Sequence, residues 1–270
     1  MSTRQLVNLS TLAVDAALEA GKEIMRIYLD PKQDFGIEKK ADNSPLTLAD
    51  KAAHDCIVRH LEPTGIPILS EEGAHLPYEE RKEWRRLWIV DPLDGTKEFI
   101  KKNGEFTVNI ALVEDGNPIL GVIYVPATGV LYGGITSPCP SQGGENVKGA
   151  WKEKQGVREI VNSKSSNSKC YTIVASRSHL TPETEDFIEE MRKKHDKIQL
   201  ISSGSSLKMC LVAEGEADIY PRFAPTMEWD TAAGDAICRA AGRRVVDANT
   251  GQPLTYNKAD LHNPWFIVKE

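Results

Sequence analysis

Acidic side chains come directly after two short apolar segments that are predicted to be β-strands. Glu71 follows residues 66–69, and Asp91 and Asp94 follow residues 87–90. Ligands of open sheets gather beyond the carboxyl ends of strands, so a site is expected where these carboxylates lie. Carboxylates that converge repel one another and become protonated unless a cation neutralises them. Oxygen ligands without nearby histidine or cysteine favour magnesium, calcium or manganese over zinc.

The segment 91–96, with the sequence Asp-Pro-Leu-Asp-Gly-Thr, combines several chemical features in one turn. Pro92 stiffens the backbone between the two acids, and the carbonyl of Leu93 lies between them as a further oxygen ligand. Gly95 permits close approach of the backbone, and Thr96 can open a helix whose N–H groups face a bound phosphate. The alternative is an ordinary turn followed by a helix cap, and the segment alone does not decide between the two.

Two further acids occur at the predicted starts of helices. Asp230 opens the small-residue segment 230–236, which can pack closely against the other carboxylates. Asp50 lies three residues after Thr47, which is a capping-box pattern. Each of these acids also fits a plain capping role, so they support a metal site only in combination with the strand-end carboxylates.

Hydrophobic periodicity predicts the elements that position these residues. Apolar or small side chains spaced three and four apart predict a helix over residues 5–28, and a second helix is expected from about 47 to 61. Residues 108–113 and 119–125, joined across Asp115-Gly116, give the clearest hairpin signal, and a further strand is expected at 129–135.

Beyond residue 168, short apolar runs alternate with helical patterns, which indicates an α/β arrangement. Strands are expected near 171–175, 198–202, 217–220, 243–247 and 265–268, and helices near 182–194, 205–214 and 230–241. Residues 137–168 are rich in Gly, Ser, Lys and Asn, with some strand possible near Trp151. We therefore expect an α+β half, residues 1–140, carrying most of the metal ligands, and an α/β half, residues 141–270, carrying Asp230 and the residues for substrate choice.

Composition and charge exclude several classes of protein. Of the 270 residues, 40% are hydrophobic and 27% are charged, which is typical of a globular protein. The five cysteines contain no Cys-x-x-Cys pair, so neither a disulfide framework nor a zinc site is expected. The net charge is −6, and the short basic clusters at 81–86 and 192–197 are interpreted as solvated helix faces. Without interleaved aromatics, they do not predict nucleic-acid binding.

No run approaches the roughly 18 apolar residues that a membrane-spanning helix needs. The first residues also lack the apolar centre of a signal peptide. We therefore expect a cytoplasmic protein without an integral membrane segment, with peripheral attachment at the inner membrane as an alternative.

Four segments, in this order, resemble the inositol monophosphatase superfamily of metal-dependent, usually lithium-sensitive phosphatases. They are Leu-Thr-Leu-Ala-Asp at 46–50, Leu-Ser-Glu-Glu at 69–72, Trp-Ile-Val-Asp-Pro-Leu-Asp-Gly-Thr at 88–96 and Trp-Asp-Thr-Ala-Ala-Gly at 229–234. The resemblance implies a layered αβαβα sandwich of the inositol monophosphatase and fructose-1,6-bisphosphatase type, of mixed α+β and α/β class.

Within the superfamily, further segments resemble the 3′(2′),5′-bisphosphate nucleotidases, which are connected with sulfur assimilation. These segments are 94–99, 103–110, 176–179, 204–208 and 220–223. The resemblance implies a hydrolase that removes the 3′-phosphate of adenosine 3′,5′-bisphosphate, giving AMP and phosphate by attack of metal-activated water. The same reaction would convert 3′-phosphoadenosine 5′-phosphosulfate to adenosine 5′-phosphosulfate.

The resemblance also implies roles for individual residues and a cofactor of two or three Mg²⁺ ions. The implied metal ligands are Glu71, Asp91, the Leu93 carbonyl, Asp94 and Asp230. The implied catalytic residues are Asp50, Glu71 and Thr96, with Thr96 as a hydroxyl relay between the attacking water and Asp50. The implied substrate contacts are Gly95, Thr96, Ser176, His179, Ser205, Lys208 and Asp230, with Arg222 as a weaker candidate.

Several alternatives remain open on the sequence. The same fold could hydrolyse inositol monophosphate or fructose 1,6-bisphosphate, and a protein of another class could bind a nucleotide or metal without catalysis. His179 also fits a surface or helix-capping role, and Arg177 a structural one. The expected partner is a small bisphosphorylated nucleotide and not a nucleic acid, and the chain is expected to be a monomer or a homodimer.

Overall fold

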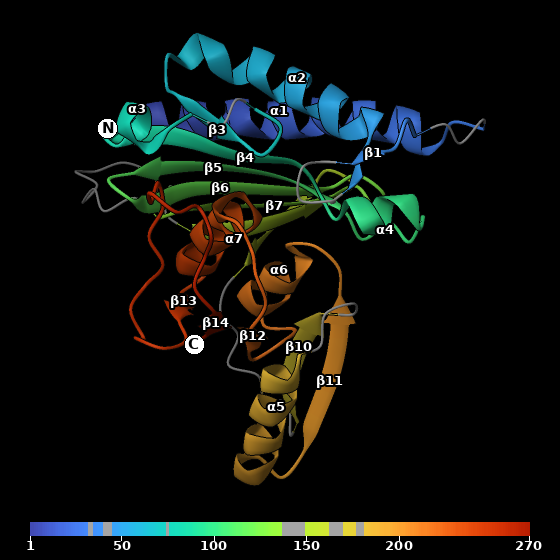
Figure 1. The fold of residues 1–270 in the computed structure, drawn as a ribbon, viewed down its shortest axis with the longest axis vertical. Helices are drawn as coiled ribbons and strands as arrows, with labels where there is room; N and C mark the ends of the chain where they lie inside the picture. Colours follow the sequence, from blue (N-terminus) through green and yellow to red (C-terminus); the bar gives the residue numbers. More distant parts are fainter. Residues whose placement is uncertain (32–34, 40–44, 74–75, 137–148, 162–169, 177–180) are drawn as a thin grey trace.

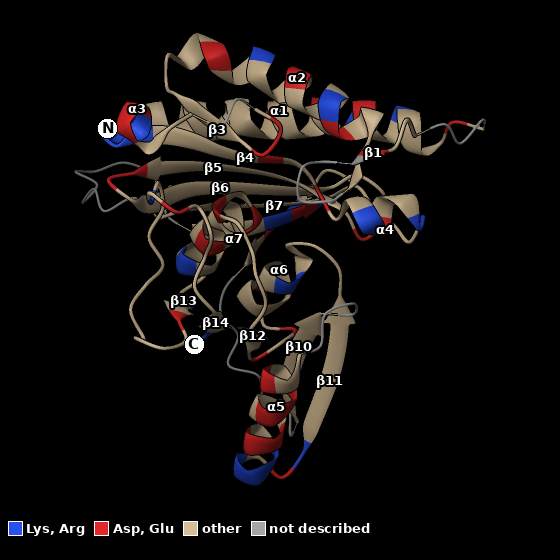
Figure 2. Cartoon of the chain, viewed as in Figure 1, with Lys and Arg blue, Asp and Glu red and all other residues tan. Residues whose placement is uncertain are grey.

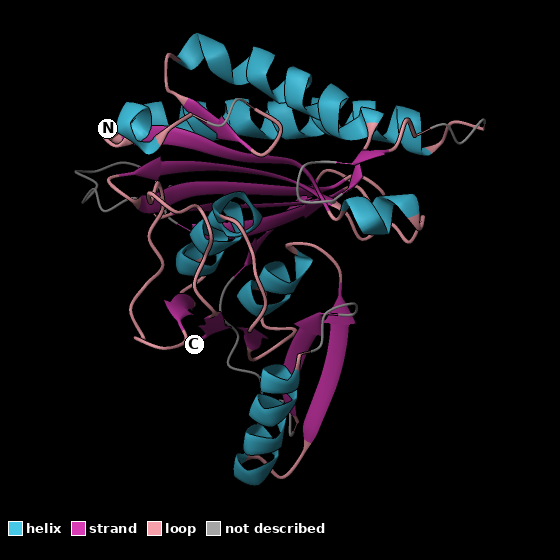
Figure 3. Ribbon diagram, viewed as in Figure 1, coloured by secondary structure: helices cyan, strands magenta, loops and turns pink. Residues whose placement is uncertain are grey.

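The helices and sheets of the chain stack in the order helix, sheet, helix, sheet, helix (Figures 1 and 3). The computed structural model describes all residues from 1 to 270 except 32–34, 40–44, 74–75, 137–148, 162–169 and 177–180. This layer order confirms the expected αβαβα sandwich. Among the described residues, no helix combines the length and apolar character needed to cross a membrane.

The outer helical layer consists of α1 (Thr3–Tyr28) and α2 (Leu48–Leu61), which pack against each other and against one face of the large sheet. Helix α1 begins in a capping box between Ser2 and Gln5, and its buried side chains are mostly alanine and isoleucine. Helix α2 is capped by Thr47. Both helices confirm the predicted periodicity, because the apolar stripe of each faces the sheet.

The large sheet has the strand order β3-β4-β5-β6-β7-β8-β9. Its strands are β3 (Ile68–Ser70), β4 (Arg86–Asp94), β5 (Thr107–Glu114), β6 (Asn117–Val125), β7 (Val130–Ile135), β8 (Gly149–Lys154) and β9 (Val157–Val161). Strand β3 is parallel to β4, and all other neighbours are antiparallel. The β5–β6 hairpin turns at Asp115 and Gly116, which both have positive φ, as the Asp-Gly signal predicts.

Short elements extend these layers. They are the pair β1 (Glu38–Lys39) and β2 (Pro45–Leu46), the 3-10 turn η1 (Glu62–Thr64), α3 (Tyr78–Arg81) and α4 (Thr96–Ile100). Helix α4 starts at Thr96, in agreement with the prediction that Thr96 can open a helix.

The second helical layer consists of α6 (Leu207–Ala213) and α7 (Glu228–Ala240). Helix α7 packs on the opposite face of the large sheet, and α6 packs against α7 and the second sheet layer. Glycines on two strands allow α7 to approach the backbone of the sheet. A Cβ atom at Gly121 would lie 2.2 Å from the carbonyl oxygen of Ala233, and one at Gly134 would lie 2.7 Å from the Cα of Ile237. The strand glycines and the small residues of α7 therefore let the helix pack directly on β6 and β7. This packing positions Asp230 in the first turn of α7.

The remaining strands form the second sheet layer. Strands β10 (Tyr171–Ser176) and β11 (Ile198–Ser203) are parallel, and β12 (Tyr220–Arg222), β14 (Phe266–Lys269) and β13 (Arg244–Asp247) form an antiparallel sheet. A bridge between Ile173 and Ile219 joins the two. The last helix, α5 (Pro182–Lys194), packs Ile188 and Met191 on these two isoleucines. The strand expected at 217–220 is displaced to 220–222, because residues 217–219 contribute only this bridge.

Charged residues of both signs lie along α5, and its last basic residues are exposed, as expected for a solvated cluster at 192–197 (Figure 2). The interpretation of residues 81–86 as solvated is wrong at Arg81, which is buried. Its guanidinium donates to the Asn257 side chain at 2.9 Å and to the Lys258 carbonyl at 2.7 Å. Oxygen atoms of residues 257–259, in a distant loop, thus hold this arginine in place. The division of the chain at residue 140 stays a prediction.

Candidate active site

Strand β4 and helix α7 bring three carboxylates together. The β4–β5 register shifts between Asp91, which pairs with Asn109, and Asp94, which pairs with Thr107. This bulge lets two acids of one strand reach the same site. Asp230 arrives from the first turn of α7, and oxygens of Asp91, Asp94 and Asp230 all lie within 4.8 Å of one another. The structure therefore gathers three of the predicted ligands from segments far apart in the sequence.

Burial makes this cluster electrostatically unfavourable without a cation. Burial raises the pKa of Asp91 well above its usual range, and the charges of Glu71 and Asp94 raise it further. Burial, followed by the charge of Asp94, raises the pKa of Asp230 to about 8. The carboxylates cannot all ionise at neutral pH unless positive charge is supplied.

The other predicted ligands border the cluster. The backbone N–H of Glu71, at the end of β3, donates to the Val90 carbonyl at 3.1 Å, which fixes Glu71 beside β4. The Leu93 carbonyl oxygen lies 3.4 Å from the Thr96 hydroxyl oxygen. The donor set thus consists of carboxylate and carbonyl oxygens, and it fits a hard divalent cation.

Asp50 and Thr96 form a hydrogen-bonded pair at the edge of the cluster. The Thr96 hydroxyl donates to Asp50 Oδ1 at 3.2 Å. Asp50 Oδ2 accepts from the backbone N–H of Thr47 at 2.7 Å and from its hydroxyl at 2.5 Å. The carboxylate is therefore held on one side by its own helix, and it presents its other oxygen to Thr96.

Two residues that the sequence did not single out connect the predicted ligands. The Ser206 hydroxyl lies 2.5 Å from Asp94 Oδ2 and 2.9 Å from the Asp230 carbonyl oxygen. The Asn109 amide donates to Ser206 Oγ at 2.8 Å and to Asp94 Oδ2 at 3.3 Å. A buried amide in the otherwise apolar strand β5 was the available signal for Asn109. Ser206 lies in the segment 204–208 that carries the resemblance, but a serine before a helix has an ordinary capping explanation, so it was not singled out.

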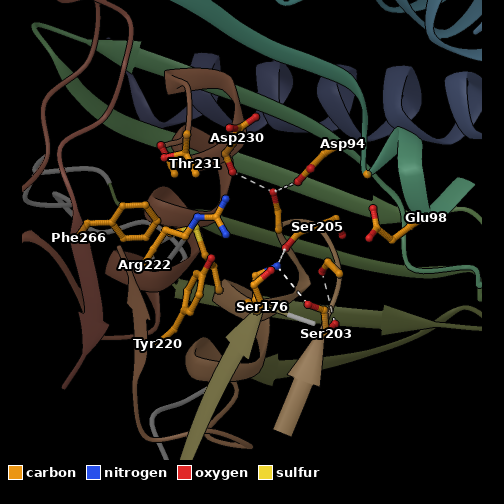
Figure 4. Close-up of a pocket in the computed structure, with 16 residues that line it drawn as sticks. Asp94, Glu98, Ser176, Ser203, Ser205, Tyr220, Arg222, Asp230, Thr231 and Phe266 are labelled. Atoms are coloured by element: carbon orange, nitrogen blue, oxygen red, sulfur yellow. Dashed lines mark hydrogen bonds between the residues drawn. The ribbon is translucent and has the colours of Figure 1, made fainter. Parts of the chain in front are cut away.

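A pocket of about 130 Å³ opens beside the carboxylates, between the large sheet and the second sheet layer (Figure 4). Its residues come from the ends of β4, β10 and β11, from α4, from the loop 203–206 and α6, and from β12, α7 and β14. They include Asp94, Gly95, Glu98, Ser176, Ser203, Ser205, Lys208, Tyr220, Arg222, Asp230 and Phe266. Gly95 has a φ of +92°, and its missing side chain leaves room for the Glu105 carbonyl and Ser205. Ser176, Ser205, Lys208 and Arg222, predicted to contact substrate, all line this pocket.

Lys208 lies under the loop 203–206. Its ammonium donates to the carbonyls of Ser203 at 3.2 Å and Ser205 at 2.6 Å. Burial lowers its pKa to about 8, against the opposing charge of Asp94, while Arg222 lowers it further. Lys208 therefore holds the backbone of the loop that lines the pocket and also contributes positive charge there. The predicted contact at His179 and the alternative role of Arg177 lie outside the described residues.

Comparison with known proteins places this geometry in a family. The sequence matches the inositol monophosphatase family over residues 5–265. It is 46% identical over 256 residues to the 3′(2′),5′-bisphosphate nucleotidase CysQ of Shigella flexneri, covering 93% of this chain and 96% of the relative. It is 32% identical over 260 residues to the Haemophilus influenzae protein of the same name, covering 93% and 89%.

Solved structures agree with this assignment. The crystal structure of CysQ from Bacteroides thetaiotaomicron, described as a bacterial member of the inositol monophosphatase family, superimposes with a TM-score of 0.85. It shares 54% identity and covers 97% of both chains. SuhB from Bartonella henselae, at 24% identity and a TM-score of 0.74 over 97% of this chain and 93% of its own, shares the fold. The family is metal-dependent, in keeping with the acidic cluster. The chain belongs to the inositol monophosphatase family.

Proposed function

We propose that this protein is a magnesium-dependent 3′(2′),5′-bisphosphate nucleotidase that converts adenosine 3′,5′-bisphosphate to AMP and phosphate. One observation carries the proposal: the acidic cluster adjoins a pocket that Arg222 and Lys208 line. A substrate with two anionic groups can place one at the carboxylates, through a cation, and the other near these basic residues. The relatives named as bisphosphate nucleotidases support this assignment.

Two or three Mg²⁺ ions held by Glu71, Asp91, the Leu93 carbonyl, Asp94 and Asp230 would neutralise the phosphate and lower the pKa of the attacking water. Gly95 and Thr96, at the start of α4, would hold the phosphate that is cleaved. The protein itself contributes positioning, which is the larger part of phosphoryl-transfer catalysis.

Thr96 and Asp50 provide a route for the proton of the attacking water. Because the Thr96 hydroxyl donates its hydrogen toward Asp50 Oδ1, its oxygen can accept a hydrogen bond from water. As Thr96 takes a proton from the water, it passes its own hydrogen to Asp50 Oδ1, and Thr47 holds the second oxygen of Asp50 in place. General-base assistance of this kind typically contributes about 10²–10⁴-fold to rate.

The second anionic group would be recognised by the polar and basic residues of the pocket beside the carboxylates. Ser205 Oγ and Arg222 Nε are both buried and have no hydrogen-bond partner among the described residues. Figure 4 shows the Arg222 guanidinium projecting from β12 into the pocket, with Tyr220 and Phe266 nearby. Unpaired buried polar groups are costly, and a bound phosphate or ribose would reduce that cost. Ser176 and His179 complete the proposed set of contacts.

A substrate panel tests the proposal. With Mg²⁺, phosphate release should be fastest from adenosine 3′,5′-bisphosphate and 3′-phosphoadenosine 5′-phosphosulfate. Inositol 1-phosphate and fructose 1,6-bisphosphate, the substrates of the alternative activities, should be slower. Equal or reversed rates would reject the nucleotide assignment, and nucleotide binding without any hydrolysis would favour a non-catalytic protein.

A further inference from the structure

Ser206 occupies the N-cap position of α6 but does not cap the helix. Its side chain makes no hydrogen bond to the first turn of α6, although this is the usual role of an N-cap serine. The hydroxyl lies instead against Asp94 on β4 and the Asp230 carbonyl on α7. In Figure 4, dashed lines run from Asp94 and from Asp230 to one oxygen between them. The Ser206 side chain therefore contacts β4 and α7 and leaves the first turn of α6 without a side-chain cap.

The hydroxyl has one hydrogen, so it can donate to Asp94 or to the Asp230 carbonyl but not to both at once. The shorter contact and the negative charge favour Asp94, because hydrogen bonds to an ionised acceptor are the stronger ones. Asn109 donates to Ser206 Oγ and to the same carboxylate oxygen. One oxygen of Asp94 therefore faces two donors, which fixes the plane of the carboxylate and the direction of its other oxygen.

Ser206 also belongs to the loop that forms the pocket. Its neighbour Ser205 lines the pocket, and the carbonyl of Ser205 is held by Lys208. With 4% of its surface exposed, Ser206 is shielded from water and cannot exchange its partners freely. A shift of this loop would therefore move the hydroxyl that orients Asp94.

We propose that Ser206, supported by Asn109, is a positioning residue that orients Asp94 for the divalent cation and couples the loop 203–206 to the acidic cluster. The inference rests on the proposed metal-dependent function. Outer hydrogen-bond partners of metal ligands typically change metal affinity by about 10–100-fold when they are removed. The expected effect is thus on cation binding itself, before any turnover.

Calorimetric titration of the full-length chain with MgCl₂ tests this proposal. Ser206→Ala should weaken Mg²⁺ affinity by about 10-fold, at the lower end of that range, while leaving α6 intact because no cap is lost. Asn109→Ala should weaken affinity in the same direction. The double variant should lose less than the product of the two single effects, because both residues act through one carboxylate.

Thr136→Val is the matched control. Its hydroxyl donates to the Pro118 carbonyl at 3.0 Å, where β6 begins and far along the sheet from Asp94, so Mg²⁺ affinity should be unchanged. A wild-type chain that binds no Mg²⁺ would refute the proposed function itself. If the wild-type chain binds Mg²⁺ and both single variants bind it equally tightly, only the role of Ser206 is overturned. If Ser206→Ala fails to fold, Asn109→Ala decides the question.

The coupling has a separate readout. In the wild-type chain, a saturating concentration of AMP should change the Mg²⁺ affinity. AMP would contact the loop 203–206, the cation would contact the acidic cluster, and Ser206 connects the two. Since the effects of two ligands on each other are reciprocal, Mg²⁺ should change AMP affinity by the same factor. This factor should fall toward one in Ser206→Ala, and a factor equal to that of the wild type would overturn the coupling.

Discussion

Thr96 and Asp50 are joined by a hydrogen bond of 3.2 Å that connects the first residue of α4 to the third residue of α2. Asp50 divides its oxygens between two tasks. Oδ2 completes the capping box with Thr47, and Oδ1 accepts from Thr96. The capping and relay roles that the sequence left as alternatives are therefore compatible, because each uses a different oxygen of one carboxylate.

Replacing the charge of Asp50 should separate catalysis from binding. Asp50→Asn keeps the size of the side chain but removes the acceptor of the Thr96 proton, so kcat should fall by about 10²–10⁴-fold. KM and Mg²⁺ affinity should change little, since Asp50 is not among the proposed ligands. Steady-state kinetics and calorimetry measure both quantities. Asp55→Asn, exposed on the same helix, is the control. An unchanged kcat would remove Asp50 from the proton relay.

Neutralising Asp91 should have opposite effects on stability and on activity. Asp91→Asn removes the cost of protonating a buried carboxyl on folding, so the metal-free protein should melt higher, by about 2 °C for each kcal/mol gained in a domain of this size. Turnover and the rise in Tm on adding Mg²⁺ should both be nearly lost. Scanning calorimetry with EDTA and with Mg²⁺ provides the test, with the exposed Asp186→Asn as control. Retained turnover would exclude Asp91 as a ligand.

The stability of the metal-free protein should fall as the pH rises. The pKa of Asp230 is raised to about 8 in the folded chain, from an ordinary value of 3.8. A group with a raised pKa stabilises the fold while it is protonated, and this contribution is lost as the pH rises through the folded pKa. Asp235, whose pKa burial raises to about 6, contributes only to the lower part of this range.

Measurements of Tm in EDTA should therefore decline between about pH 4 and pH 8, the interval between the ordinary and the folded pKa of Asp230. Saturating Mg²⁺ should flatten the decline, because the cation replaces the proton at the carboxylates. Asp230→Asn should also reduce the slope without Mg²⁺. A metal-free Tm that is constant or increases over this interval would contradict the assignment.

Loss of the Lys208 charge should lower kcat/KM at alkaline pH, but only for substrates that carry a second phosphate. Its pKa is lowered to about 8, mainly by burial, so its positive charge is lost above that pH. For adenosine 3′,5′-bisphosphate, kcat/KM should then decline above about pH 8, since this ratio reports the free enzyme. Lys208→Arg should move the decline to higher pH because arginine stays protonated. Adenosine 3′-monophosphate, without the second phosphate, should show no such decline, and identical profiles for both substrates would argue against the role.

Local signals in the sequence were sufficient for much of the fold. The cap at Thr47 and the turn at Asp115-Gly116 were predicted because each depends on residues only a few positions apart. Arg81 was misjudged because the carbonyls that bury it lie about 176 residues away along the chain. For the same reason the contact of Ser206 with Asp94, across 112 residues, was not visible. A polar residue before a helix has an ordinary local explanation, and only the packed structure shows that it is not used.

The close packing of α7 on Gly121 and Gly134 has a consequence for biosynthesis. The large sheet is complete in the chain by residue 161, yet one of its faces stays bare until residues 228–240 have left the ribosome. The same helix delivers Asp230 to the cluster. Coverage of this face and acquisition of the third carboxylate are thus one event, so a nascent or shortened chain that ends before residue 228 would have neither.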